Sequence, residues 1–178
     1  AQRVGMTPEQ LFEKYRLRTV AESVAGGQQF DQTGRIITDT PAFRAWFGDS
    51  KVVDAQGKPL VVYHGTTSEF ATFAPNSHLG TASQANAIMN YEQRRGEGSQ
   101  RLLPVYLRIE NPKRVDDAAD WQDEVEQAKA EGYDGLVYAN WGEFDPDADG
   151  NPRDSYVAFR PEQIKSATGN NGNFDPSD

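Results

Sequence analysis

The sequence lacks cysteine altogether and contains only two histidines and two methionines among its 178 residues. The absence of cysteine excludes disulfide scaffolds, thiolate zinc sites and cysteine nucleophiles. No apolar run approaches the ~20 residues that a membrane-spanning helix needs, and no charged-then-apolar leader opens the chain, so we expect no membrane partner. The chain begins at an alanine and ends in a polar tail rich in Asn and Gly, and we expect it to be a domain of a larger polypeptide.

Basic side chains are scarce. The 18 Lys and Arg residues stand against 27 Asp and Glu, which gives a net charge of −9 and a pI near 4.7. Most of this acidity is local, because residues 110–154 hold 14 acidic and 4 basic side chains. A net acidic protein has few cations to neutralise nucleic-acid phosphates and repels them, so a nucleic-acid partner is not favoured. The acidic segment is better suited to guiding a basic protein.

Helix-capping signals divide the chain into two parts. The segment Thr7-Pro8-Glu9-Gln10 predicts a helix start, and Gly26-Gly27 predicts its end. Residues 28–39 are polar and predict a linker or an arm on the main domain. At ~150 residues per domain, the length predicts one main domain, residues 40–178, preceded by the helix and arm of residues 1–39.

Within the main domain, apolar periodicity predicts a mixture of helices and strands. We expect helices at 41–47, 82–95 and 120–131, and strands at 51–54, 59–64, 103–110, 136–139 and 155–159. The strand at 59–64 should be buried on both faces, and Asn111-Pro112 should end the strand at 103–110. In the second helix, the residues expected to face the core are Ala85, Ile88, Met89 and Tyr91. The mixed connections favour an α+β fold over a doubly wound parallel sheet.

Both histidines lie in short segments that could carry chemistry: Tyr63-His64-Gly65-Thr66 and Ser77-His78-Leu79-Gly80-Thr81. His64 follows an apolar strand and precedes a glycine and a hydroxyl. This arrangement lets the backbone approach a ligand while the imidazole and the hydroxyl bind it. The simpler interpretation is a strand end with a surface histidine and, at 77–81, a loop. The residues alone leave both interpretations open.

A metal site is not predicted. The segment Asp145–Gly150 matches the first half of a calcium loop, but the twelfth position is Tyr156 where a bidentate Glu is expected. A turn rich in Asp, Gly and Pro between two strands explains the segment without an ion. Glu143 lies just before this loop, at a strand end, where a carboxylate could stabilise a developing cation or activate a hydroxyl.

Two blocks of the sequence are familiar. The first spans residues 43–73 and includes Gly-Lys-Pro-Leu-Val-Val-Tyr-His-Gly-Thr at 57–66. The second combines Tyr-Asp-Gly-Leu-Val-Tyr at 133–138, followed by Asn140 and Glu143, with the stretch 154–175. Together they resemble the ADP-ribosyltransferase-like domains of polyvalent proteins from phages and mobile elements. The resemblance covers about residues 40–178, is specific in these two blocks, and leaves residues 1–39 outside.

The resemblance implies a split β-sheet with flanking helices that clamps NAD⁺ as a co-substrate, with no metal. In the diphtheria-toxin and poly-ADP-ribose-polymerase branch, the signature is His, Tyr and Glu on three strands. His64 matches the first position, and His78 replaces the Tyr that stacks on nicotinamide. The residues that the resemblance assigns to NAD binding are Tyr63, His64, Gly65, Thr66, Gly80, Thr81 and Ser155.

The third signature position is altered. Ser155 aligns with the Glu of the family's strand, and the nearby carboxylates able to replace it are Glu143 and Asp154. We favour Glu143, because similar domains place an acid shortly after the Tyr-Asp-Gly strand. The catalytic residues implied in this way are Glu143 and His78.

The activity implied is mono-ADP-ribosylation of a macromolecule, with a protein as the favoured acceptor. The setting implied is a phage or bacterial toxin or effector that acts in the cytoplasm of a bacterial host cell or is delivered into it. Two alternatives stay open: a metal-independent endoribonuclease that uses His64 and His78, and a catalytically inactive NAD-binding or interaction module.

Overall fold

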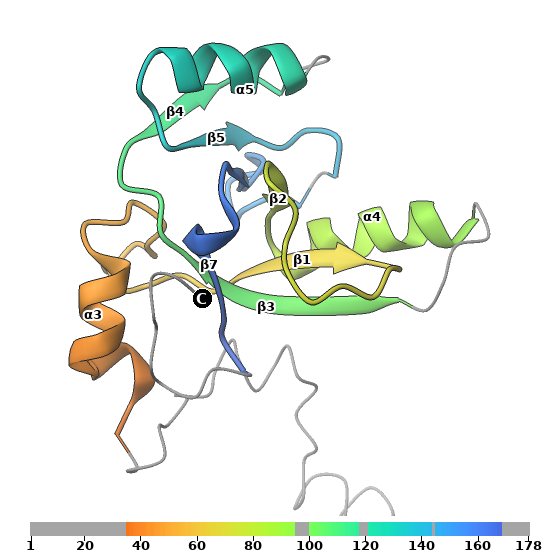
Figure 1. The fold of residues 1–178 in the computed structure, drawn as a ribbon. Helices are drawn as coiled ribbons and strands as arrows, with labels where there is room; N and C mark the ends of the chain where they lie inside the picture. Colours follow the sequence, from red (N-terminus) through yellow and green to blue (C-terminus); the bar gives the residue numbers. More distant parts are fainter. Residues whose placement is uncertain (1–34, 95–99, 118–120, 144, 169–178) are drawn as a thin grey trace, which may run out of the picture.

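The computed structural model describes residues 35–94, 100–117, 121–143 and 145–168, with side chains described up to Asn90 in the first of these ranges. Two separate sheets form its centre, and helices lie on the outside (Figure 1). The helix predicted at 7–24, most of the arm, and the tail beyond 168 fall outside the described residues. The α+β fold with a split sheet that the sequence predicts is confirmed.

The smaller sheet has three antiparallel strands in the order β1-β3-β7. The larger sheet has four strands in the order β2-β6-β5-β4, of which only β4 and β5 are parallel. The strands are β1 (Val62–Thr66), β2 (Ser77–Leu79), β3 (Arg101–Leu107), β4 (Pro112–Val115), β5 (Gly135–Ala139), β6 (Asp154–Ala158) and β7 (Ile164–Ser166).

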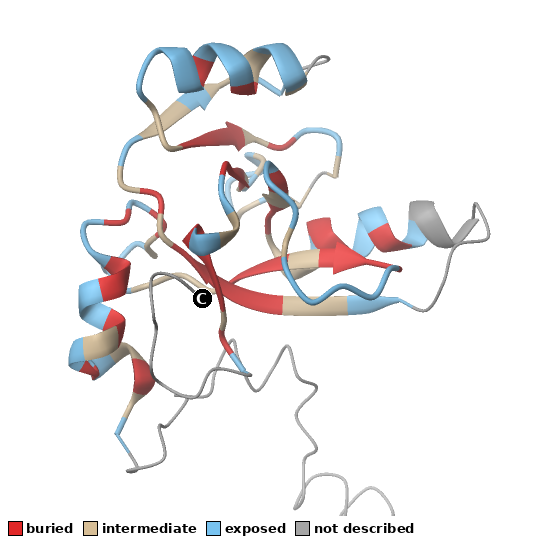
Figure 2. Cartoon of the chain, in the orientation of Figure 1, coloured by how far each residue is buried: buried red, intermediate tan, exposed pale blue. Residues whose placement is uncertain are grey.

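The main core lies between the two sheets. Alternate residues of the strands face it, and Figure 2 shows the central strands as the most buried part of the chain. This core cluster contains Val52, Val62, Leu79, Val105, Leu107, Ile109, Val137, Tyr156, Ala158 and Ile164. Since burial of apolar side chains is the main favourable term in folding, this cluster holds the two sheets together.

Helix α3 (Pro41–Phe47) covers the other face of the smaller sheet. It begins as predicted, with the Thr40 hydroxyl accepting a hydrogen bond from the Phe43 amide at 3.1 Å. Its aromatic side chains pack against Tyr106 of β3. Ile37, in the 3₁₀ helix η1 (Ile37–Asp39), is buried in the same cluster, so the packed body starts before the helix.

Helix α5 (Trp121–Ala130) covers the outer face of the larger sheet (Figure 1). Val125 and Ala128 pack there against Leu136 and Val157, as the apolar spacing of the helix predicts. Among the described residues, no helix is both long and apolar enough to cross a lipid bilayer.

Helix α4 (Ala82–Arg94) lies along β1 (Figure 1). The helix starts where predicted, and the Thr81 hydroxyl caps it by accepting a hydrogen bond from the Gln84 amide at 3.2 Å. Gly65 allows the close approach, because a Cβ at this position would lie 2.1 Å from the carbonyl oxygen of Ala85. Ala85 and Met89 are buried, whereas Ile88 is 36% exposed, so its predicted core position is wrong. The side chain of Tyr91 lies outside the described set.

Several strand predictions are corrected. His78 lies on strand β2 rather than in a loop. Pro112 begins β4 instead of ending β3, as a strand's first residue can without losing a ladder hydrogen bond. In the segment predicted to be buried on both faces, the strand starts only at Val62, and Leu60 and Val61 are half-buried. The three short strands β2, β4 and β7 have too few residues for a period to emerge.

We predict that Gly65→Ala destabilises the fold. The added methyl group would collide with the backbone of α4, and such overpacking costs about 1–3 kcal/mol of unfolding free energy. Urea denaturation measures the change. The matched control is Gly142→Ala, whose Cβ would meet its nearest atoms at an ordinary 3.7 Å. Equal stability of the two variants would contradict the close packing of α4 on β1.

Candidate functional site

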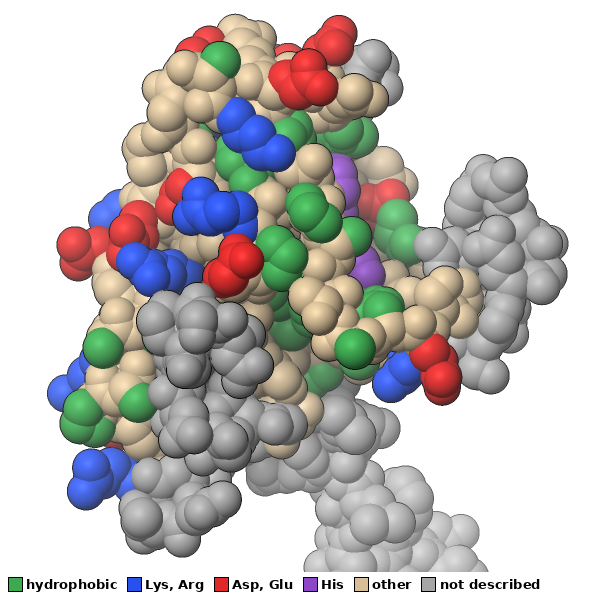
Figure 3. Space-filling view, viewed as in Figure 1, with side chains coloured by type: hydrophobic (Ala, Val, Ile, Leu, Met, Phe, Trp, Pro, Cys, Tyr) green, Lys and Arg blue, Asp and Glu red, His purple; other side chains and the backbone are tan. Residues whose placement is uncertain are grey.

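A pocket of about 410 Å³ opens between the two sheets and the start of α4. Eight of the nine site residues expected from the sequence line it, and Figure 3 shows histidine side chains at the surface among hydrophobic ones. These eight are Tyr63, His64, Gly65, Thr66, His78, Gly80, Glu143 and Ser155. A cleft of this volume is in the range of small-molecule sites.

The two sheets meet at one pair of residues beside the pocket. The Tyr63 amide donates to the Gly80 carbonyl at 2.8 Å, and the Gly80 amide donates back to the Tyr63 carbonyl at 3.0 Å. A side chain at position 80 would not fit, because a Cβ would lie 2.3 Å from Gln84 Oε1 and 2.7 Å from Ser155 Oγ. The pair therefore holds His64 and His78 close together, on β1 and β2.

The tautomer of His64 follows from its hydrogen bond. Its Nδ1 lies 2.9 Å from the carbonyl oxygen of His78. Because a carbonyl oxygen only accepts, Nδ1 must carry the proton, and Nε2 of the neutral ring is left as an acceptor. The rings of Phe70 and Phe73 pack edge-on against the imidazole at 5.9 and 5.4 Å. The ring is thus fixed in orientation with one nitrogen uncommitted.

His78 belongs to an aromatic group on the opposite wall. Its ring lies 5.0 Å from that of Trp121, and its Nδ1 lies 3.2 Å from the hydroxyl of Tyr138. Burial lowers the pKa of His78 below its ordinary 6.5; the charge of His64 adds to this shift, and Asp117 opposes it. Burial also raises the pKa of Tyr138 strongly, with Glu143 adding to it, so that the phenol keeps its proton.

Glu143 is held at the pocket by its neighbour Asn140. The Asn140 amide Nδ2 donates to Glu143 Oε2 at 2.5 Å, and the Glu143 backbone amide donates to Asn140 Oδ1 at 2.8 Å. Asp154, the other carboxylate considered for this role, is paired with Arg114 through two contacts of 2.6 and 3.1 Å and does not line the pocket. The geometry thus favours Glu143 over Asp154.

Two of the expected ligand-binding residues are occupied by internal bonds. Thr81 does not line the pocket; its hydroxyl caps α4 and donates to Asp145 at 2.6 Å. Ser155 lines the pocket but is 2% exposed, and its hydroxyl donates to Gln84 at 3.0 Å and accepts from Asn140 at 2.9 Å. Ser155 therefore forms part of the pocket wall, and Thr81 holds the start of α4; neither offers a free binding group.

The sequence interpretation missed several pocket residues. These are Leu79, Gln84, Ala85, Ile88, Asp117, Trp121, Tyr138, Asn140 and Gly142. Trp121 and Tyr138 have the apolar periodicity of core residues, so no local signal marks them. Asp117 accepts from the amides of Trp141 and Gly142 at 3.0 and 3.1 Å and shapes the loop before Glu143. Asn140 lies in the second of the two blocks that resemble the family, and nothing else in the sequence indicates a functional role for it.

The acidic loop forms a turn. Asp147 Oδ1 accepts from the amides of Asp149 and Asn151, both at 2.9 Å. The backbone hydrogen bond from Asn151 is the main cause that lowers the pKa of Asp147. Within the described ranges, no three His, Asp or Glu side chains are grouped closely enough to hold a metal ion.

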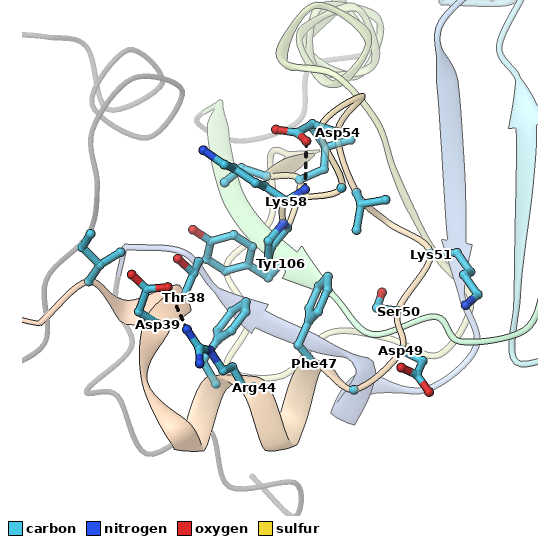
Figure 4. Close-up of a pocket in the computed structure, with 18 of the residues that line it drawn as sticks. Thr38, Asp39, Arg44, Phe47, Asp49, Ser50, Lys51, Asp54, Lys58 and Tyr106 are labelled. Carbon is cyan, nitrogen blue, oxygen red and sulfur yellow. Dashed lines mark hydrogen bonds and ion pairs between the residues drawn. The ribbon is translucent and has the colours of Figure 1, made fainter.

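A larger hollow of about 1,050 Å³ lies on the other side of β1, beside α3. Three of its charged side chains have partners: Arg44 pairs with Asp39 at 3.1 Å, and Asp54 accepts from the Lys58 amide at 2.9 Å (Figure 4). It contains neither histidine nor Glu143. Size alone therefore does not identify the candidate site; the smaller pocket has the chemistry.

Comparison with known families gives a match over most of the chain. A family model described as "ADP-ribosyltransferase in polyvalent proteins" matches residues 54–174. No curated protein matches the sequence. The matched range contains every strand of both sheets and every residue that lines the pocket between them.

We predict that His78 titrates below pH 6.5 in the folded protein. NMR titration of its ring protons measures the midpoint directly. Because the unfolded chain then binds the proton more tightly, stability decreases as the pH falls from 7.5 through 6.5 towards the folded pKa. In His78→Asn this part of the decrease should disappear. A midpoint at or above 6.5 would contradict the buried, uncharged state of the ring.

Proposed function

The chain belongs to the family of ADP-ribosyltransferases in polyvalent proteins, and on this premise we propose that it is an NAD-dependent mono-ADP-ribosyltransferase with a macromolecular acceptor. The observation that carries the proposal is the gathering of His64, Thr66 and Glu143 at one pocket inside the matched range. We further propose that the acceptor is a protein and that the domain acts as a phage or bacterial toxin or effector in a bacterial cytoplasm.

The pocket suits the nicotinamide riboside end of NAD⁺. His64 Nε2 can accept from a ribose hydroxyl, since Nδ1 is already bonded. The Thr66 oxygen accepts from the Ser68 amide at 3.1 Å, which leaves its proton for a ligand acceptor. Asp117 and Glu143 are the charged residues of the lining, which contains no Lys or Arg. This charge favours the cationic nicotinamide ring over an RNA phosphodiester, and thus disfavours the endoribonuclease alternative.

The proposed role of Glu143 follows from the chemistry of the bond that breaks. Cleaving the nicotinamide–ribose bond builds oxocarbenium-like positive charge on the ribose, as in glycoside hydrolysis. A carboxylate fixed beside the ribose hydroxyls stabilises that charge without reorganising during the reaction. The aromatic group of His78, Trp121 and Tyr138 offers a surface against which the nicotinamide ring can stack.

The surroundings of the pocket support a protein acceptor. Of the residues that the structure describes, the large hydrophobic side chains classed as exposed are Phe70, Ile88 and Trp141. Ile88 lines the pocket, Phe70 packs against His64, and Trp141 lies between the pocket residues Asn140 and Gly142. Apolar groups exposed around an acidic pocket are typical of a surface that binds polypeptide.

We predict that Glu143→Gln lowers NAD⁺ turnover by about 10²–10⁴-fold, the range for a carboxylate acting in the transition state. Affinity for NAD⁺ should change little, because the side chain keeps its size and its position beside Asn140. Nicotinamide release and calorimetric binding measure the two effects. The matched control is Glu126→Gln, which removes the same charge from the exposed face of α5.

The assay with labelled NAD⁺ and a bacterial lysate separates the alternatives. Label on protein bands, together with nicotinamide release, is the expected result. RNA cleavage without NAD⁺ would instead support the endoribonuclease, and thermal stabilisation by NAD⁺ without turnover would support an inactive binding module. Turnover that Glu143→Gln leaves intact would refute the assignment of this residue.

A further inference from the structure

A chain of buried hydrogen bonds lies directly behind Glu143. Asn140, at the end of β5, is 2% exposed, and its amide is fully used. Nδ2 donates to Glu143 Oε2 at 2.5 Å and to Ser155 Oγ at 2.9 Å, while Oδ1 accepts from the Glu143 amide at 2.8 Å. A side-chain amide has two donor hydrogens, and both are used here.

The chain continues from Ser155 to helix α4. The Ser155 hydroxyl donates to Gln84 Oε1 at 3.0 Å, and the same oxygen accepts from the Thr81 amide at 2.8 Å. Gln84 Nε2 donates to the carbonyl of Arg153 at 3.1 Å. Gln84 is also 2% exposed, so water does not compete for these bonds.

Backbone groups at the far end fix the direction of every bond. The Thr81 amide can only donate and the Arg153 carbonyl can only accept, so Gln84 has one possible amide orientation. Its Oε1 then accepts a hydrogen bond from the Ser155 hydroxyl, and Ser155 Oγ in turn accepts from Asn140 Nδ2.

The remaining Asn140 hydrogen then points at Glu143. Two sets of groups therefore set the polarity of the last bond: the Glu143 backbone amide, which can only donate to Asn140 Oδ1, and the chain from α4, more than 50 residues away in the sequence.

We propose that Asn140 is the positioning residue for Glu143, and that Ser155 and Gln84, together with the Glu143 backbone amide, fix its side-chain amide so that a donor always faces the carboxylate. This inference rests on the proposed function, in which Glu143 acts on the ribose. It also gives a role to Ser155, which aligns with the family's Glu: β6 supplies the hydroxyl that orients the amide, and the end of β5 supplies the carboxylate.

The charges around Glu143 make this donor important. Besides Glu143, the titratable groups in the lining are Tyr63, His64, His78, Asp117 and Tyr138. Burial favours the uncharged forms of His78 and Tyr138, Asp117 is the second carboxylate, and no Lys or Arg lines the pocket. Within the described residues, Asn140 is thus the side chain that donates to the Glu143 carboxylate. Without it, the carboxylate loses both its orientation and its partner.

The first test replaces the donor with an acceptor of the same shape. Asn140→Asp should lower kcat for NAD⁺ turnover by about 10–100-fold, the scale of a misplaced catalytic group, with KM changed less than about twofold. In this variant the acid limb of the pH–kcat profile should move to higher pH, because the new carboxyl group at position 140 and that of Glu143 are adjacent and cannot both ionise freely. Asn151→Asp, which adds the same charge on the exposed acidic loop, should change neither quantity.

A second measurement does not depend on activity. The ¹³C signal of the Glu143 carboxyl group, followed by NMR across pH, should show its titration midpoint raised by at least about one unit in Asn140→Asp. An unchanged midpoint, or an unchanged kcat, overturns the positioning role. If the native protein never turns over NAD⁺, the proposed function fails, whereas the NMR titration still decides the role of Asn140.

A double-mutant cycle separates positioning from general structure. In the Glu143→Gln background, Asn140→Asp should cause no further loss of kcat, since no carboxylate is left to position. Additive losses would indicate a structural role only and refute the proposal. Should Asn140→Asp fail to fold, Ser155→Ala is used instead; it removes one of the groups that fix the Asn140 amide, while the Glu143 backbone amide remains. It should lower kcat by about 3–10-fold with the same non-additivity.

Discussion

The reciprocal hydrogen bonds between Tyr63 and Gly80 are the constraint on which the candidate site depends. They join the smaller sheet to the larger one at a single point, and the core between the sheets fills the space behind it. His64 follows Tyr63 directly, and His78 lies two positions before Gly80. The Tyr63–Gly80 pair therefore brings both imidazoles to the same pocket. Gln163 makes a second bridge at the far end: its side-chain amide donates to the carbonyls of Arg108 and Asp134 at 2.9 and 2.8 Å. With both ends tied, the opening between the sheets keeps a fixed shape.

The polar wall of the pocket is costly to bury and is therefore fully bonded. Gln84, Asn140 and Ser155 are each 2% exposed, and no buried side-chain N or O atom of the described residues lacks a partner. A buried polar group without a partner costs about 1–3 kcal/mol, so a satisfied network is stable while a broken one is not. The same low exposure makes each hydrogen bond stronger than in water. A rigid polar wall is what a site needs if its charges are to be in place before the substrate arrives.

The net charge of −9 overstates the negative charge at the pocket, because few of the carboxylates lie there. Several carboxylates of the segment 110–154 are engaged: Asp154 with Arg114, Asp147 within its turn, and Asp117 with two backbone amides. Asp117 and Glu143 are the acids that line the pocket, and there they favour a cationic ligand group. The ion pair of Arg114 with Asp154 is largely exposed, and such pairs contribute at most about 1 kcal/mol. It joins β4 to the start of β6 across β5, away from the pocket.

The sequence alone determined what local signals encode. Helices α3, α4 and α5 and the strand around Tyr63 follow from local signals, and the motif at His64 together with Glu143 predicts the chemistry that we propose. Only the tertiary structure decided the rest. Strands β2, β4 and β7 are stabilised by partners distant in the sequence and have no period of their own. Gln84 has no local signal, and Asn140 has only its place in the closing block, because the roles of both arise from hydrogen bonds to Ser155, 71 and 15 residues away. Spacing along the chain reports which face a residue lies on, whereas the direction of a donated proton is set by the groups that folding brings to it.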